Sequence, residues 1–199
     1  MEKIFELLTE ELKKDNHWDR LTTINYNWKN DIIFQNYHKL GQKQKGTLGE
    51  YYVERLMDMS GYDVSAPTHT DHDKIINGLK VEIKTSLATS DKEKIIKDKF
   101  IFNHIAIKKD WDRLLFCCVN PDPSWGNMHT RRNDKLPYER LRVYFMDKCD
   151  FVDYMSNTSD SENIFKHQQG GKSGNNDDYV CQNFHKLRSL PFVKQLSEW

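Results

Sequence analysis

The dipeptide Asn77-Gly78 constrains this chain more than any other short feature of it. It stands between two apolar, β-prone runs, and both residues tolerate the positive φ angles of a type I′ turn. The sequence therefore predicts a β-hairpin centred on this dipeptide. The centre also fixes the cross-strand partners, so that Ile76 faces Leu79 and Asp73 faces Glu82.

The two faces of the predicted hairpin differ in chemistry. Because side chains alternate between the faces of a strand, Asp73, Glu82 and Lys84 share one face. The opposite face is apolar and suited to a core, and it carries Ile76, Leu79, Val81 and Ile83. One side of the hairpin is thus expected to pack, while the other presents two carboxylates and an ammonium group together.

The facing carboxylates of Asp73 and Glu82 require an explanation, because like charges at paired strand positions destabilise a hairpin. A divalent cation between them removes the repulsion, and Mg²⁺ binds one or two carboxylates together with waters and phosphate oxygens. Lys84 is placed to orient a water or to stabilise charge on a phosphate. The alternative is a solvent-facing hairpin in which Lys84 pairs with Asp71 and Lys80 lies beside Glu82. The hairpin alone does not decide between the two.

A second segment, residues 46–61, is predicted to form a helix. Thr47 is a suitable N-cap with Glu50 at the N3 position, and Gly61 supplies a stop. The apolar residues recur at helical spacing, namely Leu48, Tyr52, Leu56 and Met59. Glu50 has two interpretations: it completes a capping box with Thr47, or it lies beside the hairpin carboxylates. The order of helix, short strand at 62–64 and hairpin occurs in one known nuclease core.

Asp73, followed after a turn by Glu82-Ile83-Lys84, resembles the signature of the PD-(D/E)xK nuclease superfamily, which includes type II restriction endonucleases and several repair nucleases. The resemblance implies that Asp73, Glu82 and the Ile83 carbonyl bind Mg²⁺, with one or two ions in each active site. It also implies that Lys84 positions or activates the attacking water. Glu50 would be the further acidic residue that an upstream helix brings to the site.

The resemblance covers about residues 41–120, and it implies a restriction-endonuclease-like α/β fold with three layers, in which helices flank a mixed central sheet. His72 stands where the family pattern has a proline, a position that varies widely in that family. Further strands are predicted at 100–102, 113–119 and 140–146, and helices at 3–14 and around Pro191. The chain 1–199 is interpreted as a single nuclease domain, with DNA-recognition and dimer elements in 125–199.

Composition agrees with one domain, since 199 residues with 12% aromatic side chains can fill a core. No run reaches the roughly 18 apolar residues of a membrane helix, and the N-terminus does not resemble a signal peptide. The four cysteines lack C-x-x-C spacing, so free thiols in a reducing cytoplasm are expected and zinc is not.

Charge is balanced, with 30 basic and 30 acidic residues, whereas many DNA-binding proteins are basic. Local distribution matters more than the sum, so basic stretches remain candidates for DNA contact, although each is equally a solvated loop. The glycine-rich stretch 167–178 is either a linker or a recognition loop whose amides read adenine edges. The predicted DNA contacts are Lys43, Lys45, Arg131, Arg132, Gln168, Gln169, Lys172, Asn175 and Asn176.

These features together predict a Mg²⁺-dependent endodeoxyribonuclease acting on double-stranded DNA, and more narrowly a type II site-specific restriction endonuclease. A homodimer is expected, because two-fold symmetric DNA sites match two-fold symmetric proteins. The alternatives are a repair or recombination nuclease of the same fold, a non-catalytic DNA-binding module, and an interaction protein whose hairpin charges are only surface. Asp71 is left open as either a partner of Lys84 or the end of a strand.

Overall fold

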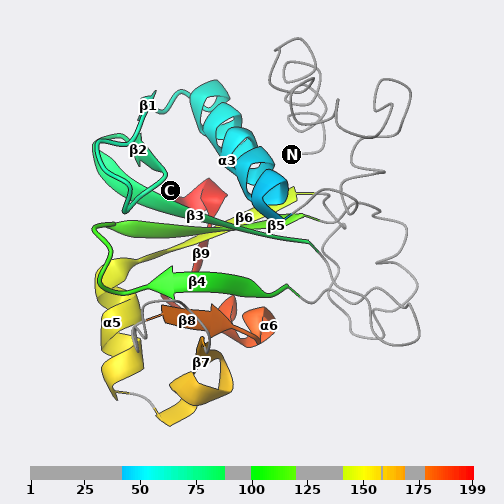
Figure 1. Ribbon diagram of the computed structural model, residues 1–199, viewed down its shortest axis with the longest axis vertical. Coiled ribbons are helices and arrows are strands. Elements are labelled where there is room, and N and C mark those ends of the chain that lie inside the picture. The colour runs from blue at the N-terminus through cyan, green and yellow to red at the C-terminus, as the bar shows by residue number, and fades with distance from the viewer. Residues whose placement is uncertain (1–41, 88–99, 120–140, 158, 169–177) are drawn as a thin grey trace, which may run out of the picture.

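A six-stranded mixed sheet lies at the centre of the structure (Figure 1). This computed structural model describes residues 42–87, 100–119, 141–157, 159–168 and 178–199. The strands follow the order β1 (Val64–Ser65), β2 (Lys74–Ile76), β3 (Leu79–Leu87), β5 (Arg113–Val119), β6 (Leu141–Asp147) and β9 (Lys194–Gln195). The pair β3–β5 is parallel, and the other neighbouring strands are antiparallel. The predicted α/β fold with a mixed central sheet is confirmed.

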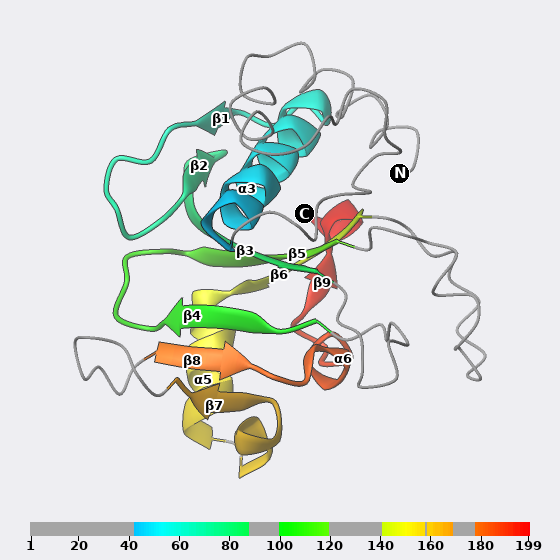
Figure 2. The ribbon, with the colours of Figure 1, turned by 45° about the vertical axis from the view of Figure 1, so that its right-hand side comes forward.

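Helix α3 (Gln42–Met59) covers one face of this sheet, and a second sheet lies against the other face (Figures 1 and 2). The second sheet has the order β4 (Phe102–Ala106), β8 (Asp178–Cys181) and β7 (Phe165–His167). Three helices lie on the same side of the central sheet as the second sheet: α5 (Lys148–Asn157), α6 (Phe184–Leu187) and a short 3₁₀ helix at Ser159–Asn163. The strand predicted at 100–102 therefore begins later and belongs to this second sheet, which was not expected.

Strand β5 separates two apolar cores. Leu115 and Cys117 face α3, whereas Leu114 and Phe116 face the second sheet, and all of these side chains are buried. A strand that is covered on both faces reads as a continuous apolar run, which is why 113–119 was predicted correctly from its sequence. The strand predicted at 140–146 is confirmed with a shift of one residue.

The β2–β3 hairpin has the predicted register. Ile76 pairs with Leu79 and Lys74 with Val81 across the turn, where Asn77 and Gly78 have φ angles of 48° and 79°. The predicted apolar face is also confirmed, because Ile76, Val81 and Ile83 are buried and Leu79 packs partly against them. Strand β2 begins only at Lys74, however, so Asp73 lies outside the ladder and the predicted strand pair of Asp73 with Glu82 does not form.

Helix α3 begins at Gln42, about a turn before the predicted start near Thr47. Thr47 is therefore not an N-cap, and its hydroxyl donates to the carbonyl of Lys43, one turn earlier (3.1 Å). The extra turn is made of Gln and Lys, which are good helix formers. The predicted stop at Gly61 is confirmed: its φ is 84°, and Tyr62 N donates to Met57 O in a Schellman arrangement (3.1 Å).

Helix α3 approaches β3 most closely at Gly49. A Cβ atom built on Gly49 would lie 1.8 Å from the hydroxyl oxygen of Thr85, which is far inside van der Waals contact. The glycine thus allows the helix backbone to lie directly on the strand. The next residue, Glu50, is carried with it towards the same part of β3.

Gly49→Ala is expected to lower the free energy of unfolding by about 1–3 kcal/mol, the usual cost of overpacking. Gly46→Ala is the matched control in the same helix, because a Cβ there meets nothing within 4 Å. That change should raise the free energy of unfolding by about 0.5–1 kcal/mol through helix propensity. Urea titration measures both, and equal effects of the two alanines would contradict the close approach.

The C-terminal stretch is not the helix predicted around Pro191. Helix α6 ends at Leu187, and the chain continues through β9, which pairs with β6, to a 3₁₀ helix at Leu196–Glu198. Proline cannot continue a helix, since it lacks a backbone N–H and clashes with the preceding turn. The ring of Trp199 then stacks on the Arg113 guanidinium, 4.4 Å from the ring centroid. The helix predicted at 3–14 lies outside the described residues.

Within the described part of the chain, no helix is both long enough and apolar enough to cross a membrane. All four cysteines are free, as expected: Cys117, Cys118 and Cys181 are buried, and Cys149 is exposed.

Candidate active site

Strand β3 has an open edge beyond the hairpin. The β2–β3 ladder ends at Val81, and from Glu82 onwards no described strand pairs with β3 on that side. The carboxylate of Asp73 supplies a hydrogen bond there that a neighbouring strand would otherwise supply, because its Oδ2 accepts from Ile83 N (2.7 Å). The N–H and C=O of one residue point to the same side of a strand, so the Ile83 carbonyl also faces this edge.

Glu82 lies at this edge but is almost completely buried, with 2% of its surface exposed. Its Oε1 accepts hydrogen bonds from Lys84 Nζ (2.5 Å) and Lys109 Nζ (3.2 Å). Its Oε2 is buried and has no hydrogen-bond partner within the described ranges. An unpaired buried oxygen on a charged group is costly, so this atom is suited to a ligand that supplies positive charge.

Helix α3 and the residue before β2 add two more carboxyl groups. Burial raises the pKa of Asp73, and repulsion from Glu82 raises it further. Burial likewise raises the pKa of Glu50, and the charges of Asp73 and Glu82 act in the same direction. The structure therefore places Glu50, Asp73, Glu82 and Lys84 within electrostatic reach of one another. Because Thr47 is not an N-cap, the capping-box interpretation of Glu50 is wrong.

The raised pKa of Glu50 predicts how the metal-free protein responds to pH. A carboxyl group with a raised pKa in the folded state contributes stability at low pH, and this contribution is lost as pH rises through the folded pKa. Glu50→Gln removes the group that ionises. We expect the variant to be more stable than the wild type at pH 7–8 in EDTA, and the advantage to disappear near pH 4. Urea titrations across this range measure the difference, and an advantage that grows towards pH 4 would contradict the assignment.

The solvent-facing alternative for the hairpin charges does not match the structure. Lys84 bonds to the buried Glu82 rather than to Asp71, whose carboxylate lies 3.2 Å from His69 Nδ1. Lys80 pairs with Asp110 (2.6 Å) rather than lying beside Glu82. The carboxylate face of the hairpin is thus an interior site at a sheet edge.

In the described residues, no group of three or more His, Cys, Asp or Glu side chains is already gathered as a metal centre. Mg²⁺ does not need such a group, because it commonly takes one or two protein carboxylates and completes its shell with waters and phosphate oxygens. The unpaired Glu82 Oε2, the Asp73 carboxylate and the Ile83 carbonyl fit that requirement.

Lys109 is a site residue that sequence reasoning missed. It lies in the turn between β4 and β5 and reaches Glu82 from a segment distant in sequence. In the sequence, the available signal was the pair Lys108-Lys109 shortly before the apolar run 113–119. The parallel pairing of this run with β3, which brings the turn beside Glu82, is a feature of the structure.

The predicted DNA contacts are only partly described. Lys43 is exposed in the first turn of α3, and burial lowers the pKa of Lys45 nearby. The side chain of Gln168 is held by His104, whose backbone N–H donates to Gln168 Oε1 (2.8 Å). The remaining predicted contacts lie outside the described residues: Arg131, Arg132, Gln169, Lys172, Asn175 and Asn176.

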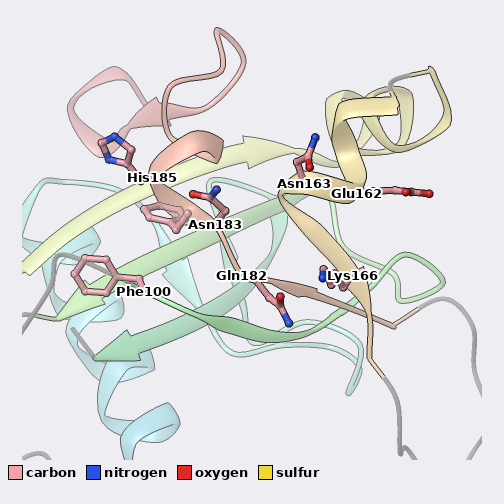
Figure 3. A pocket seen from close by; sticks show the side chains of 8 residues that line it. Phe100, Glu162, Asn163, Lys166, Gln182, Asn183 and His185 are labelled. Atoms are coloured by element: carbon pink, nitrogen blue, oxygen red, sulfur yellow. The ribbon is translucent and has the colours of Figure 1, made fainter. Parts of the chain in front are cut away.

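A surface hollow of about 460 Å³ lies near the start of β4, at the end of this strand away from Lys109 (Figure 3). Phe100 precedes β4 and lines the hollow, whereas Lys109 follows β4. Lys166, Gln182 and Asn183 also line it (Figure 3). None of the clustered carboxylates lines the hollow, so it is separate from the candidate active site.

No family model matches the chain, and no curated protein matches it in sequence. One solved structure with a similar arrangement is that of a bacterial homing endonuclease, I-Ssp6803I. It is 16% identical, the match covers 74% of this chain and 91% of that chain, and the TM-score is 0.37.

Proposed function

We propose that this chain is a Mg²⁺-dependent endodeoxyribonuclease that hydrolyses phosphodiester bonds in double-stranded DNA. The observation that carries the proposal is the buried Glu82, which keeps one oxygen without a partner in the described part of the chain. Asp73 and Lys84 flank it at the open edge of β3. Asp73 and Glu50, whose pKa values are raised by burial, lie near the same lysine, and such a setting is typical of phosphoryl chemistry.

Each residue of the cluster has a role that its position supports. Asp73, Glu82 and the Ile83 carbonyl would hold Mg²⁺, and Glu50 would reach it directly or through a water. Bound Mg²⁺ would offset charge on the phosphate and lower the pKa of a bound water. Lys84 would orient the attacking water, since its ammonium group is fixed beside Glu82.

The narrower proposal is a type II site-specific restriction endonuclease that acts as a homodimer. The described residues hold one such carboxylate site, which would act on one strand at a time, so two copies related by a two-fold axis would cut both strands of a symmetric site. The motif Asp73, Glu82 and Lys84 is complete, which favours a catalytic protein over a binding module that has lost activity.

Incubation with plasmid DNA and Mg²⁺, followed by sequencing of the ends, tests this function. Discrete fragments with a common end sequence are expected from a restriction endonuclease. Cleavage confined to junctions, flaps or mismatched duplexes would favour repair instead. DNA binding without cleavage of any of these substrates would contradict a nuclease.

A further inference from the structure

Lys109 is the second ammonium group at Glu82, and it differs from Lys84 in how it reaches the site. Lys84 is 17% exposed and comes from β3 itself, whereas Lys109 is 36% exposed and comes from the β4–β5 turn. Both bond to the same oxygen of Glu82. Lys109 therefore occupies the solvent side of the carboxylate, where a substrate would approach.

The β4–β5 turn that carries Lys109 is held firmly at its backbone. The Lys109 carbonyl accepts hydrogen bonds from Lys148 Nζ (2.5 Å) and Trp111 N (3.2 Å). The buried indole of Trp111 donates to the Ala106 carbonyl (2.9 Å), which closes the turn. A fixed backbone leaves the long Lys109 side chain as the part that can change partners.

The turn is also fastened to the hairpin by reciprocal hydrogen bonds. Lys80 N donates to the Asp112 carboxylate and Asp112 N donates to the Lys80 carbonyl, each at 2.8 Å. Lys80 lies two residues before Glu82 on β3. The position of Lys109 relative to Glu82 is thus set by contacts that do not depend on the ion pair between them.

We propose that Lys109 is a phosphate-binding residue of this site: it neutralises Glu82 while no cation is bound and turns to a non-bridging oxygen of the DNA phosphodiester when a cation takes Glu82. The proposal rests on the proposed function. A divalent cation on Glu82 repels both ammonium groups, and Lys109 is the more exposed of the two. The phosphate that arrives with the substrate then offers an anion that Lys109 can bind on the solvent side of the site.

This exchange predicts that Lys109→Gln has opposite effects on Ca²⁺ binding and on DNA binding. Removal of a competing ammonium group from Glu82 should tighten Ca²⁺ binding by the free protein about two- to fivefold, as expected for a partly screened unit charge. DNA binding in Ca²⁺ should weaken about tenfold, and the slope of log affinity against log salt should fall by about one, because one phosphate contact is lost. Single-turnover cleavage in Mg²⁺ should fall at least about tenfold.

Calorimetric Ca²⁺ titration, DNA binding at several salt concentrations and single-turnover cleavage test the proposal on the full chain. Lys109→Arg should restore DNA binding and most of the cleavage, because it keeps the charge. Lys80→Gln is the matched control and should change none of the three, because Lys80 pairs with Asp110 rather than with Glu82. A merely structural role for Lys109 would weaken Ca²⁺ and DNA binding together.

Two outcomes would overturn the proposal without touching the proposed function. One is wild-type DNA affinity and cleavage in Lys109→Gln, and the other is weaker Ca²⁺ binding by that variant, while the wild type binds Ca²⁺ and cuts DNA. A wild type that neither binds Ca²⁺ nor cuts DNA would overturn both proposals together.

Discussion

Lys84→Ala is expected to lower the single-turnover rate of DNA cleavage by about a thousandfold, within the usual range for a group that positions or protonates reactants. The ammonium group of Lys84 is held 2.5 Å from Glu82 Oε1 and is mostly buried. A water that entered the space left by the alanine would carry no positive charge and would not be held in the same position. DNA affinity measured in Ca²⁺ should stay within about threefold, because the other groups that meet phosphate are unchanged.

Lys80→Ala is the matched control for this change. Lys80 lies on the same strand and points to the same face, but it pairs with the exposed Asp110 rather than with the carboxylate cluster. Its removal should leave the cleavage rate nearly unchanged. Thermal unfolding of both variants checks that each is folded. Normal cleavage by Lys84→Ala in Mg²⁺ would contradict the assignment of the site.

Glu82→Gln is expected to abolish both divalent-cation binding and cleavage. The substitution keeps the shape of the side chain and an oxygen that accepts from Lys84, but it removes the charge that a cation requires. Ca²⁺ at a hundred times its dissociation constant should stabilise the wild type by about 2.7 kcal/mol and the variant not at all. Thermal or urea unfolding with and without Ca²⁺ measures this difference.

Glu54→Gln is the matched control for Glu82→Gln. It also removes one carboxylate, but from a residue outside the proposed cation site. Glu54 lies on α3, one turn after Glu50, and forms an ion pair with Lys74 (2.5 Å). The Glu54 variant should retain the stabilisation by Ca²⁺. If Glu82→Gln kept it as well, the cation would bind elsewhere and the proposed site would be wrong.

The parts of this site that could be predicted from sequence are those fixed by local rules. The Asn77-Gly78 turn sets the hairpin register, and the alternation of side chains along β3 places Glu82 and Lys84 on one face. The run 113–119 is apolar throughout because both of its faces are covered. Gly61 ends α3 through its left-handed backbone.

What could not be predicted depends on contacts between distant segments. Lys109 joins Glu82 only because β5 lies parallel to β3 and brings the preceding turn alongside. The second sheet pairs β4 with β8, more than seventy residues later, and no local pattern specifies that pairing. Asp73 was expected to pair with Glu82 across the hairpin, but it lies outside the ladder, and its side chain accepts a hydrogen bond from Ile83 N instead.

Conversion of supercoiled plasmid to nicked or linear DNA, with wild type and Glu82→Gln purified side by side, tests the central claim most directly. Cleavage by the wild type in Mg²⁺, its loss in EDTA and its absence in Glu82→Gln are the results that we predict. Parallel preparations separate activity of this chain from that of a contaminating nuclease. No cleavage by the wild type in Mg²⁺ on any DNA tested, or equal cleavage by the variant, would contradict a metal-dependent nuclease at the edge of β3.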